Sequence, residues 1–180
     1  MRNKAICLRR SLCYHESEMP TLGILTSSDA GARGAREDVS GRRIRELLTA
    51  AGFQVSRYEV VPDDLPVLED RLRRWCDDDH LDLIVTTGGT GLTDRDVMPE
   101  ATRAVVRREV PGMAEAMRIR TLAATPMAMI SRAVVGVRGR TLIINLPGSP
   151  KAVQECLEVV LPAIPHALEM LREHPPPHAA

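Results

Sequence analysis

At residues 82–91 the chain reads DLIVTTGGTG, a short apolar run that passes directly into three glycines within four positions. A short apolar run that ends at a turn signal predicts a strand buried on both faces. Similar runs predict further strands at 21–27, 54–61, 131–137 and 141–146. Between them, apolar residues at helical spacing predict helices at 37–51, 68–76, 99–108, 113–120 and, interrupted by prolines, 153–171.

The alternation of strands and helices predicts an α/β fold in which helices cover both faces of a mostly parallel sheet. The predicted strands at 131–137 and 141–146 are too close in sequence for a crossover helix, so they must pair antiparallel. We therefore expect a three-layer α/β/α domain with a five-stranded sheet in the order 2-1-3-5-4. The reversed fourth strand is expected at one edge of this sheet.

The composition argues against several classes of function. Lys and Arg together number 24, as do Asp and Glu, so the formal net charge is zero. A protein that binds duplex nucleic acid needs a surplus of basic residues, which this chain lacks. Aromatic residues make up only 2% of the chain, which argues against a platform that stacks RNA bases. No apolar run approaches the roughly 18 residues that a membrane span requires, so no membrane partner is expected.

The length and the cysteines indicate one domain of a cytoplasmic protein. The four cysteines are too sparse for a disulfide scaffold and have no zinc-binding spacing with the five histidines. Reduced thiols, and therefore a cytoplasmic protein, are expected. We place the domain at 19–173, after a basic stretch at 1–18 that is interpreted as a disordered or wrongly assigned extension, and before a C-terminal tail at 174–180.

The predicted turns at 28–33, 88–98 and 147–151 are expected to meet, because ligands of such sheets bind beyond the carboxyl ends of the strands. The middle turn is the most informative of the three. Gly88, Gly89, Thr90 and Gly91 allow positive φ and expose consecutive N–H groups, which suits a phosphate or pyrophosphate. The pattern is neither a Walker A loop nor a dinucleotide fingerprint, and a turn without a ligand is the alternative.

Two pairs of aspartates follow the strand ends. Asp96 is a candidate ligand for Mg²⁺, which takes one or two carboxylates and leaves its other positions to water and phosphate. For Asp94, complementing the dipole of the next helix is the favoured interpretation. Asp64 suits an N-cap, which leaves Asp63 free to face the strand ends, although the residues alone do not decide between this role and a structural one.

The first and third turns offer hydroxyl groups and glycines to a ligand. Ser27, Ser28 and Asp29 fit a turn that cradles a ligand and equally fit an ordinary loop. Pro147, Gly148 and Ser149 build a rigid helix entrance, whose free N–H groups and nearby Lys151 attract an anion unless capping is their only role. Three residues of the last two strands, Ser131, Arg132 and Asn145, are expected to reach the same cavity.

Several motifs in this order resemble the molybdopterin-binding family of molybdenum-cofactor synthesis, in its adenylyltransferase branch. The resemblance covers roughly residues 20–172 and rests on TTGGTG (86–91), RDVMPEAT (95–102), REVPGMAEAMR (108–118), SRAVVGV (131–137) and LPGSPKAVQECLE (146–158). The chain departs from the family at Met98, where Thr is usual. A related branch has a DQ pattern in place of the RDV at 95–97.

The resemblance implies a reaction in which molybdopterin and Mg-ATP give adenylylated molybdopterin and pyrophosphate. It places the family's two essential aspartates at Asp63 and Asp96, with Mg²⁺ on Asp96, and its binding loops at 27–29, 88–91 and 146–150. It also implies a homotrimer and a downstream molybdenum-insertion protein as partners. Met127 and Met129 are expected in the core or in such a subunit contact.

Three other functions remain open at the level of sequence. The chain could be a molybdopterin-binding module without catalysis, an assembly subunit, or a nucleotide pyrophosphatase on the same domain. The adenylyltransferase needs no general base, because the second pKa of a phosphate monoester is about 6 and the molybdopterin phosphate is already ionised near pH 7. This agrees with the lack of a histidine in the predicted turns.

Overall fold

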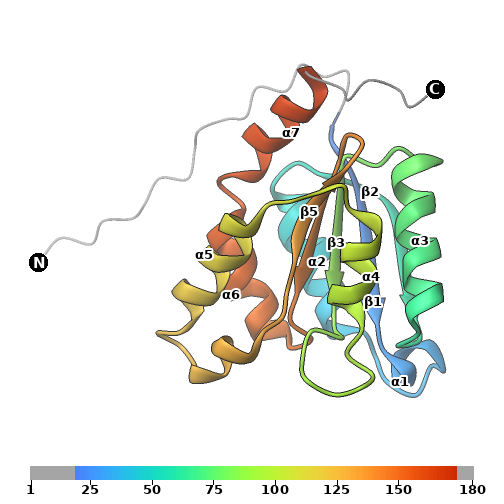
Figure 1. The fold of residues 1–180 in the computed structure, drawn as a ribbon, viewed down its shortest axis with the longest axis vertical. Helices are drawn as coiled ribbons and strands as arrows, with labels where there is room; N and C mark the ends of the chain where they lie inside the picture. Colours follow the sequence, from blue (N-terminus) through green and yellow to red (C-terminus); the bar gives the residue numbers. More distant parts are fainter. Residues whose placement is uncertain (1–18, 174–180) are drawn as a thin grey trace, which may run out of the picture.

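A computed structural model describes residues 19–173 of the chain, which form one mixed sheet with helices on both faces (Figure 1). The expected extension at 1–18 and the expected tail at 174–180 lie outside the described residues. The strands are β1 (Thr21–Ser27), β2 (Gln54–Val61), β3 (Leu83–Thr87), β4 (Arg108–Glu109), β5 (Val135–Arg138) and β6 (Thr141–Leu146). The helices are α1 (Asp29–Ala32), α2 (Val39–Ala50), α3 (Leu65–Asp77), α4 (Met98–Val105), α5 (Pro111–Thr121), the 3₁₀ helix η1 (Pro126–Ile130), α6 (Pro150–Val160) and α7 (Ile164–Glu173).

The sheet has the order β2-β1-β3-β6-β5-β4. Strands β2, β1, β3 and β6 are parallel, and β5 runs antiparallel to β6. Because β5 and β6 are the predicted fourth and fifth strands, the expected order 2-1-3-5-4 and the reversal of the fourth strand are confirmed. The turn between them at 139–140 leaves no room for a crossover.

The prediction of five strands was wrong, because a sixth strand, β4, forms the edge beside β5. Of its two exposed residues, Arg108 is the last residue of the segment predicted as a helix at 99–108, and Glu109 follows it. Helix α4 ends at Val105 because Val106 is extended, and the amide of Val110 then donates to the carbonyl of Val135 at 2.7 Å. The predicted strand at 131–137 also begins later, at Val135, and the turn at 28–33 contains the short helix α1.

The core consists of two apolar layers, one on each face of the sheet. Successive residues of β3 alternate between them, since Leu83 and Val85 face one layer and Ile84 faces the other. Helices α2, α5, α6 and α7 pack on the first face, and α3 and α4 pack on the second (Figure 1). None of the helices within 19–173 has the length and apolarity of a bilayer span.

The carboxyl ends of the parallel strands lie together at one end of the sheet, and four helices begin there. Each of these helices has a side-chain oxygen at its N-cap: Ser28 for α1, Asp38 for α2, Asp64 for α3 and Ser149 for α6. The capping roles expected for Asp64 and Ser149 are therefore present. The N-termini of helices therefore surround the carboxyl ends of the strands, where a ligand was expected.

Candidate functional site

The turns after β1, β3 and β6 touch one another, and the tightest of these contacts requires a residue without a side chain at position 88. Gly88 has φ +90°, and a Cβ atom on it would lie 2.3 Å from the carbonyl oxygen of Ser27. A Cβ atom on Gly148 would lie 3.5 Å from the Cα of Gly88. The hydroxyl of Thr87 also donates to the carbonyl of Pro147 at 2.7 Å. The structure therefore brings together the three turns that were expected to form the site.

Two cavities open on either side of this contact. The first, which we call the α2 cavity, has a volume of about 300 Å³ and lies between the ends of β1 and β3 and the start of α2. The second, the α5 cavity, has a volume of about 480 Å³ and lies between the glycine-rich loop, α5, η1 and the start of α6. Gly148 lines both, so the two cavities share a wall.

Most of the predicted site residues line one of these cavities. Those in the α2 cavity are Ser27, Ser28, Gly88 and Gly148. Those in the α5 cavity are Gly89, Thr90, Gly91, Asp96, Ser131, Pro147, Gly148 and Ser149. Asp29, Asp63 and Asn145 line neither cavity.

The Asp96 carboxylate is held by its own loop. It accepts hydrogen bonds from the amide of Thr93 at 2.8 Å and from the Thr93 hydroxyl at 2.7 Å. Gly91 leaves room for it, since a Cβ there would lie 2.9 Å from Asp96 Oδ2. Burial raises the pKa of Asp96, but the bonds from Thr93 and from the Gly91 amide bring this pKa below its ordinary value. Asp96 is therefore ionised at neutral pH.

The residues of the α5 cavity fit a cation whose other ligands are water and substrate oxygens. No cluster of three or more Asp, Glu, His or Cys side chains suited to a metal occurs within 19–173. Two carboxylates, Asp96 and Glu155, line the α5 cavity, and Mg²⁺ accepts one or two carboxylates when water and substrate oxygens complete its shell. Asp96, which follows the glycine-rich loop, is the one that the sequence predicts as a ligand, and its position in the cavity fits such an ion.

Asp63 stabilises the turn after β1. Its carboxylate accepts from the Ser27 hydroxyl at 2.5 Å and from the Asp29 amide at 3.0 Å. In return, the Asp63 amide donates to Asp29 at 3.1 Å. Arg95 closes the network with two bonds of 2.7 and 2.8 Å to Asp29, and the Arg95 bond is the main cause that holds the pKa of Asp29 below its ordinary value. Asp63 and Asp29 therefore fix the shape of the turn that Ser27 and Ser28 present to the α2 cavity.

Asn145 does not reach a cavity, contrary to expectation, because it is fully buried in the sheet. Its amide donates to the hydroxyls of Thr86 and Thr102 at 3.0 and 2.9 Å, and its carbonyl accepts from the amide of Val134 at 3.2 Å. These bonds join β3, β6, α4 and the segment before β5. Asn145 is therefore a structural residue below the site.

Two residues that line the α2 cavity, Asp38 and Ser40, were not predicted from the sequence. Asp38 accepts hydrogen bonds from the hydroxyls of Thr26 and Tyr58 at 2.6 and 2.8 Å, and burial together with this bond raises the pKa of Tyr58. Ser40 donates to the carbonyl of Gly148 at 2.7 Å and so ties α2 to the third turn. The position of Asp38 just before a helical stripe is an N-cap signal that could have identified it.

The basic side chain at the site is also not the expected one. Lys151 is 82% exposed, approaches Glu155 at 3.7 Å and lines neither cavity. Arg118 lines the α5 cavity instead, and its guanidinium donates to the carbonyl of Ala133 at 3.1 Å. Apolar side chains, among them Met117 and Ala128, form the opposite wall. The α5 cavity therefore combines an apolar wall with donors for an anion, as sites for phosphorylated heterocycles do.

Comparison with known proteins identifies relatives across this domain. Residues 23–166 match the family model described as a probable molybdopterin binding domain. A molybdopterin adenylyltransferase of Helicobacter pylori J99 is 43% identical over 152 residues, which are 83% of this chain and 86% of the relative. The Escherichia coli K12 molybdopterin adenylyltransferase is 40% identical over 141 residues, covering 77% of this chain and 72% of the relative. The crystal structure of the molybdopterin biosynthesis enzyme MoaB from Thermus thermophilus matches with a TM-score of 0.82 and 56% identity, covering 87% of this chain and 99% of that one.

The contact between Gly88 and Ser27 predicts that Gly88→Ala destabilises the protein more than Gly34→Ala. Both glycines have positive φ, but a Cβ atom on Gly34 meets no atom within 4 Å. Gly34→Ala therefore introduces only backbone strain, whereas Gly88→Ala also displaces the Ser27 backbone, which we expect to cost about 1–3 kcal/mol more. Urea denaturation of both variants measures this difference, and equal free energies of unfolding would contradict the proposed packing of the turns.

Proposed function

This chain belongs to the family of probable molybdopterin-binding domains, and we propose that it is a molybdopterin adenylyltransferase of molybdenum-cofactor biosynthesis. The observation that carries the proposal is the meeting of three strand-end turns beside Asp96, with two cavities that share Gly148. An adenylyl transfer joins two phosphorylated substrates. A site with two compartments and a common wall suits such a reaction, since each substrate occupies one compartment and the reacting phosphates meet between them.

In the proposed reaction, an oxygen of the terminal phosphate of molybdopterin attacks the α-phosphorus of ATP. A new P–O bond forms, the bond between the α-phosphorus and the oxygen that bridges to the β-phosphate breaks, and pyrophosphate leaves with the electron pair. The attacking phosphate is already ionised near pH 7, so the protein need not remove a proton. The main obstacle is the repulsion between two anions, and positioning them together supplies about 7–11 kcal/mol in favourable cases.

The chain's own groups are suited to overcome this repulsion. Gly89, Thr90 and the start of α6, which Ser149 caps, line the α5 cavity, and we assign their backbone N–H groups to the stabilisation of negative charge there. Arg118 adds a positive charge to the same cavity. Mg²⁺, when bound on Asp96, would supply further stabilisation of charge on the phosphates. We assign Asp63 a supporting part in catalysis, through the turn of Ser27 and Ser28 that it holds in place.

We expect the wild-type chain to release pyrophosphate only when molybdopterin, ATP and Mg²⁺ are all present, and Asp96→Asn to remove this activity. Because electrostatic contacts to the transition state are worth about 10²–10³ in turnover, kcat of Asp96→Asn should fall at least about 100-fold. Affinity for molybdopterin should change less than about twofold, because the apolar wall and the N–H groups of the cavity stay in place. The exposed Asp94, two residues earlier, provides the control, and Asp94→Asn should keep nearly full activity.

The same assay separates the other candidate functions. Release of pyrophosphate or phosphate from ATP without molybdopterin indicates a pyrophosphatase. Molybdopterin binding without turnover in the wild type indicates a binding module that delivers the pterin to a partner. Full turnover in Asp96→Asn contradicts the role proposed for this carboxylate.

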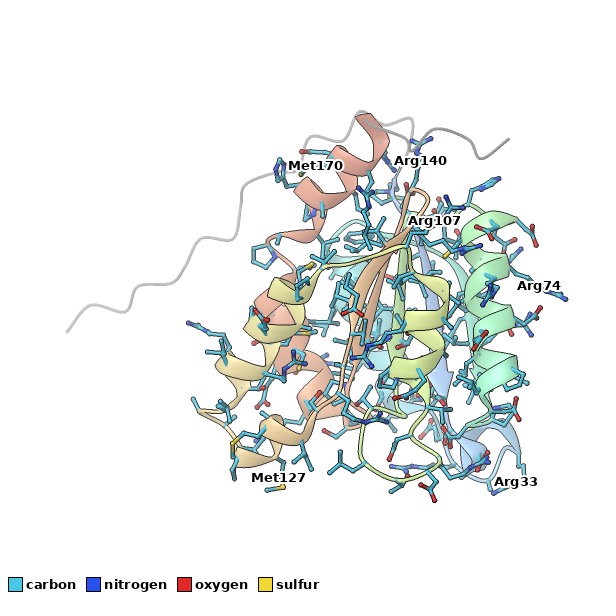
Figure 2. The ribbon with its side chains drawn as sticks, in the orientation of Figure 1. Arg33, Arg74, Arg107, Met127, Arg140 and Met170 are labelled. Atoms are coloured by element: carbon cyan, nitrogen blue, oxygen red, sulfur yellow. The ribbon has the colours of Figure 1, made fainter. Side chains whose placement is uncertain are left out.

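We also propose that the chain forms a homotrimer through the segment from the end of α5 to η1. Five large apolar residues of this segment are exposed, and they are Ile119, Leu122, Met127, Met129 and Ile130. Met127 lies on η1, at the lower side of the molecule as drawn in Figure 2. Exposed apolar residues that gather on one segment are typical of subunit contacts. The free thiols of Cys76 and Cys156 are compatible with the cytoplasmic location that we propose.

A charge in this apolar segment should dissociate the trimer. Met129 is 67% exposed, so Met129→Glu costs the folded monomer little but places a carboxylate in the proposed contact. Met170→Glu is the matched control, because Met170 is 56% exposed on α7, outside the segment. Light scattering after gel filtration should give a trimer mass for the wild type and Met170→Glu and a monomer mass for Met129→Glu. A trimer in Met129→Glu would place the contact elsewhere.

A further inference from the structure

Arg132 reaches from the segment before β5 back to the glycine-rich loop. Its Nε donates to the carbonyl of Gly91 at 2.6 Å, and its Nη2 donates to the carbonyl of Asp96. Its own amide donates to the carbonyl of Thr90 at 3.1 Å. Three carbonyl groups of the loop are therefore bonded to one residue that lies 36 or more positions further along the chain.

The two guanidinium contacts fix both ends of the segment that carries Asp96. The carbonyls of Gly91 and Asp96 mark the limits of residues 91–96, and a guanidinium presents its donors in a rigid plane. Among the described residues, no other side chain from outside residues 88–97 donates to a carbonyl of this loop. The bond from Arg95 leads the opposite way, from the loop to Asp29. The spacing between the two carbonyls, and with it the position of the Asp96 carboxylate over Gly91, therefore depends on Arg132.

We propose that Arg132 is a positioning residue, which holds residues 91–96 in the shape that places the Asp96 carboxylate and the glycine-rich N–H groups around the phosphates. The catalytic consequence rests on the proposed adenylyl transfer, but the effect on the loop does not. Arg132 acts through Asp96 and the loop backbone. Its positive charge also favours the ionised form of Asp96.

An ion pair with Glu100 is the alternative role for Arg132. The Nη1 atom of Arg132 contacts Glu100 in the first turn of α4, where the Glu100 side chain is 43% exposed. Ion pairs at this level of exposure contribute little to stability. The two roles can be separated, because Glu100→Gln removes the ion pair and leaves the bonds to Gly91 and Asp96 in place.

Amide hydrogen exchange of peptides that cover residues 88–97 tests the proposal without relying on activity. Arg132→Lys keeps the charge but loses the planar pair of donors, so exchange in this loop should become at least about tenfold faster than in the wild type. Glu100→Gln should exchange as the wild type does. Arg103 lies on α4, as Glu100 does, and forms an exposed ion pair with Glu109 of β4. Arg103→Lys is therefore the matched control and should also have no effect.

Kinetics and rescue complete the experiment. Arg132→Lys should lower kcat at least about tenfold, leave molybdopterin affinity within about twofold of the wild type, and regain part of the activity at high Mg²⁺. In Arg132→Ala, added guanidinium should restore loop protection. Wild-type exchange rates in Arg132→Lys, or an equal loss of protection in Glu100→Gln, would overturn the proposal. Faster exchange in Arg132→Lys together with an inactive wild type would instead contradict the proposed function and leave the role of Arg132 in the loop intact.

Discussion

The close approach of Gly88 to the carbonyl oxygen of Ser27 is the contact on which the site depends. Any side chain at position 88 would occupy the space of this oxygen, and the positive φ of Gly88 turns the chain away from β3 at once. The end of β3 can therefore lie against the turn after β1, and Gly148 can lie against Gly88 from the other side. Without a glycine at position 88, the turn after β3 could not lie this close to the end of β1.

The carboxylates around this contact have different partners, and the difference explains their different roles. Asp38 accepts from hydroxyls of β1 and β2. Asp63 and Asp29 are bonded to each other's turns, and Asp29 also accepts from Arg95. These carboxylates join elements of the fold. Asp96 accepts hydrogen bonds from its own loop and also lines the α5 cavity. It is therefore the carboxylate to which we assign the proposed contact with a cation.

The elements that could be predicted are those whose sequence patterns lie within one short stretch of the chain. The antiparallel pairing of β5 and β6 followed from the short link between 131–137 and 141–146, and the N-caps Asp64 and Ser149 followed from residue type and position. The edge strand β4 was missed because two exposed residues carry no alternation, and it forms only by pairing with β5. Asn145 was misplaced for a similar reason, since its burial depends on hydroxyls of β3 and α4 that are distant in sequence. The guanidinium contacts of Arg132 span 36 and 41 positions and have no local signal.

A crystal structure of the full chain with Mg²⁺ and a non-hydrolysable ATP analogue tests the central claim most directly. We expect phosphate oxygens within hydrogen-bond distance of the N–H groups of Gly89 and Thr90, and a Mg²⁺ ion about 2.0–2.1 Å from an oxygen of Asp96. The analogue should lie beside Gly148, where the two cavities meet. A nucleotide bound away from the glycine-rich loop, with no ion on Asp96, would show that this loop is not the phosphate site.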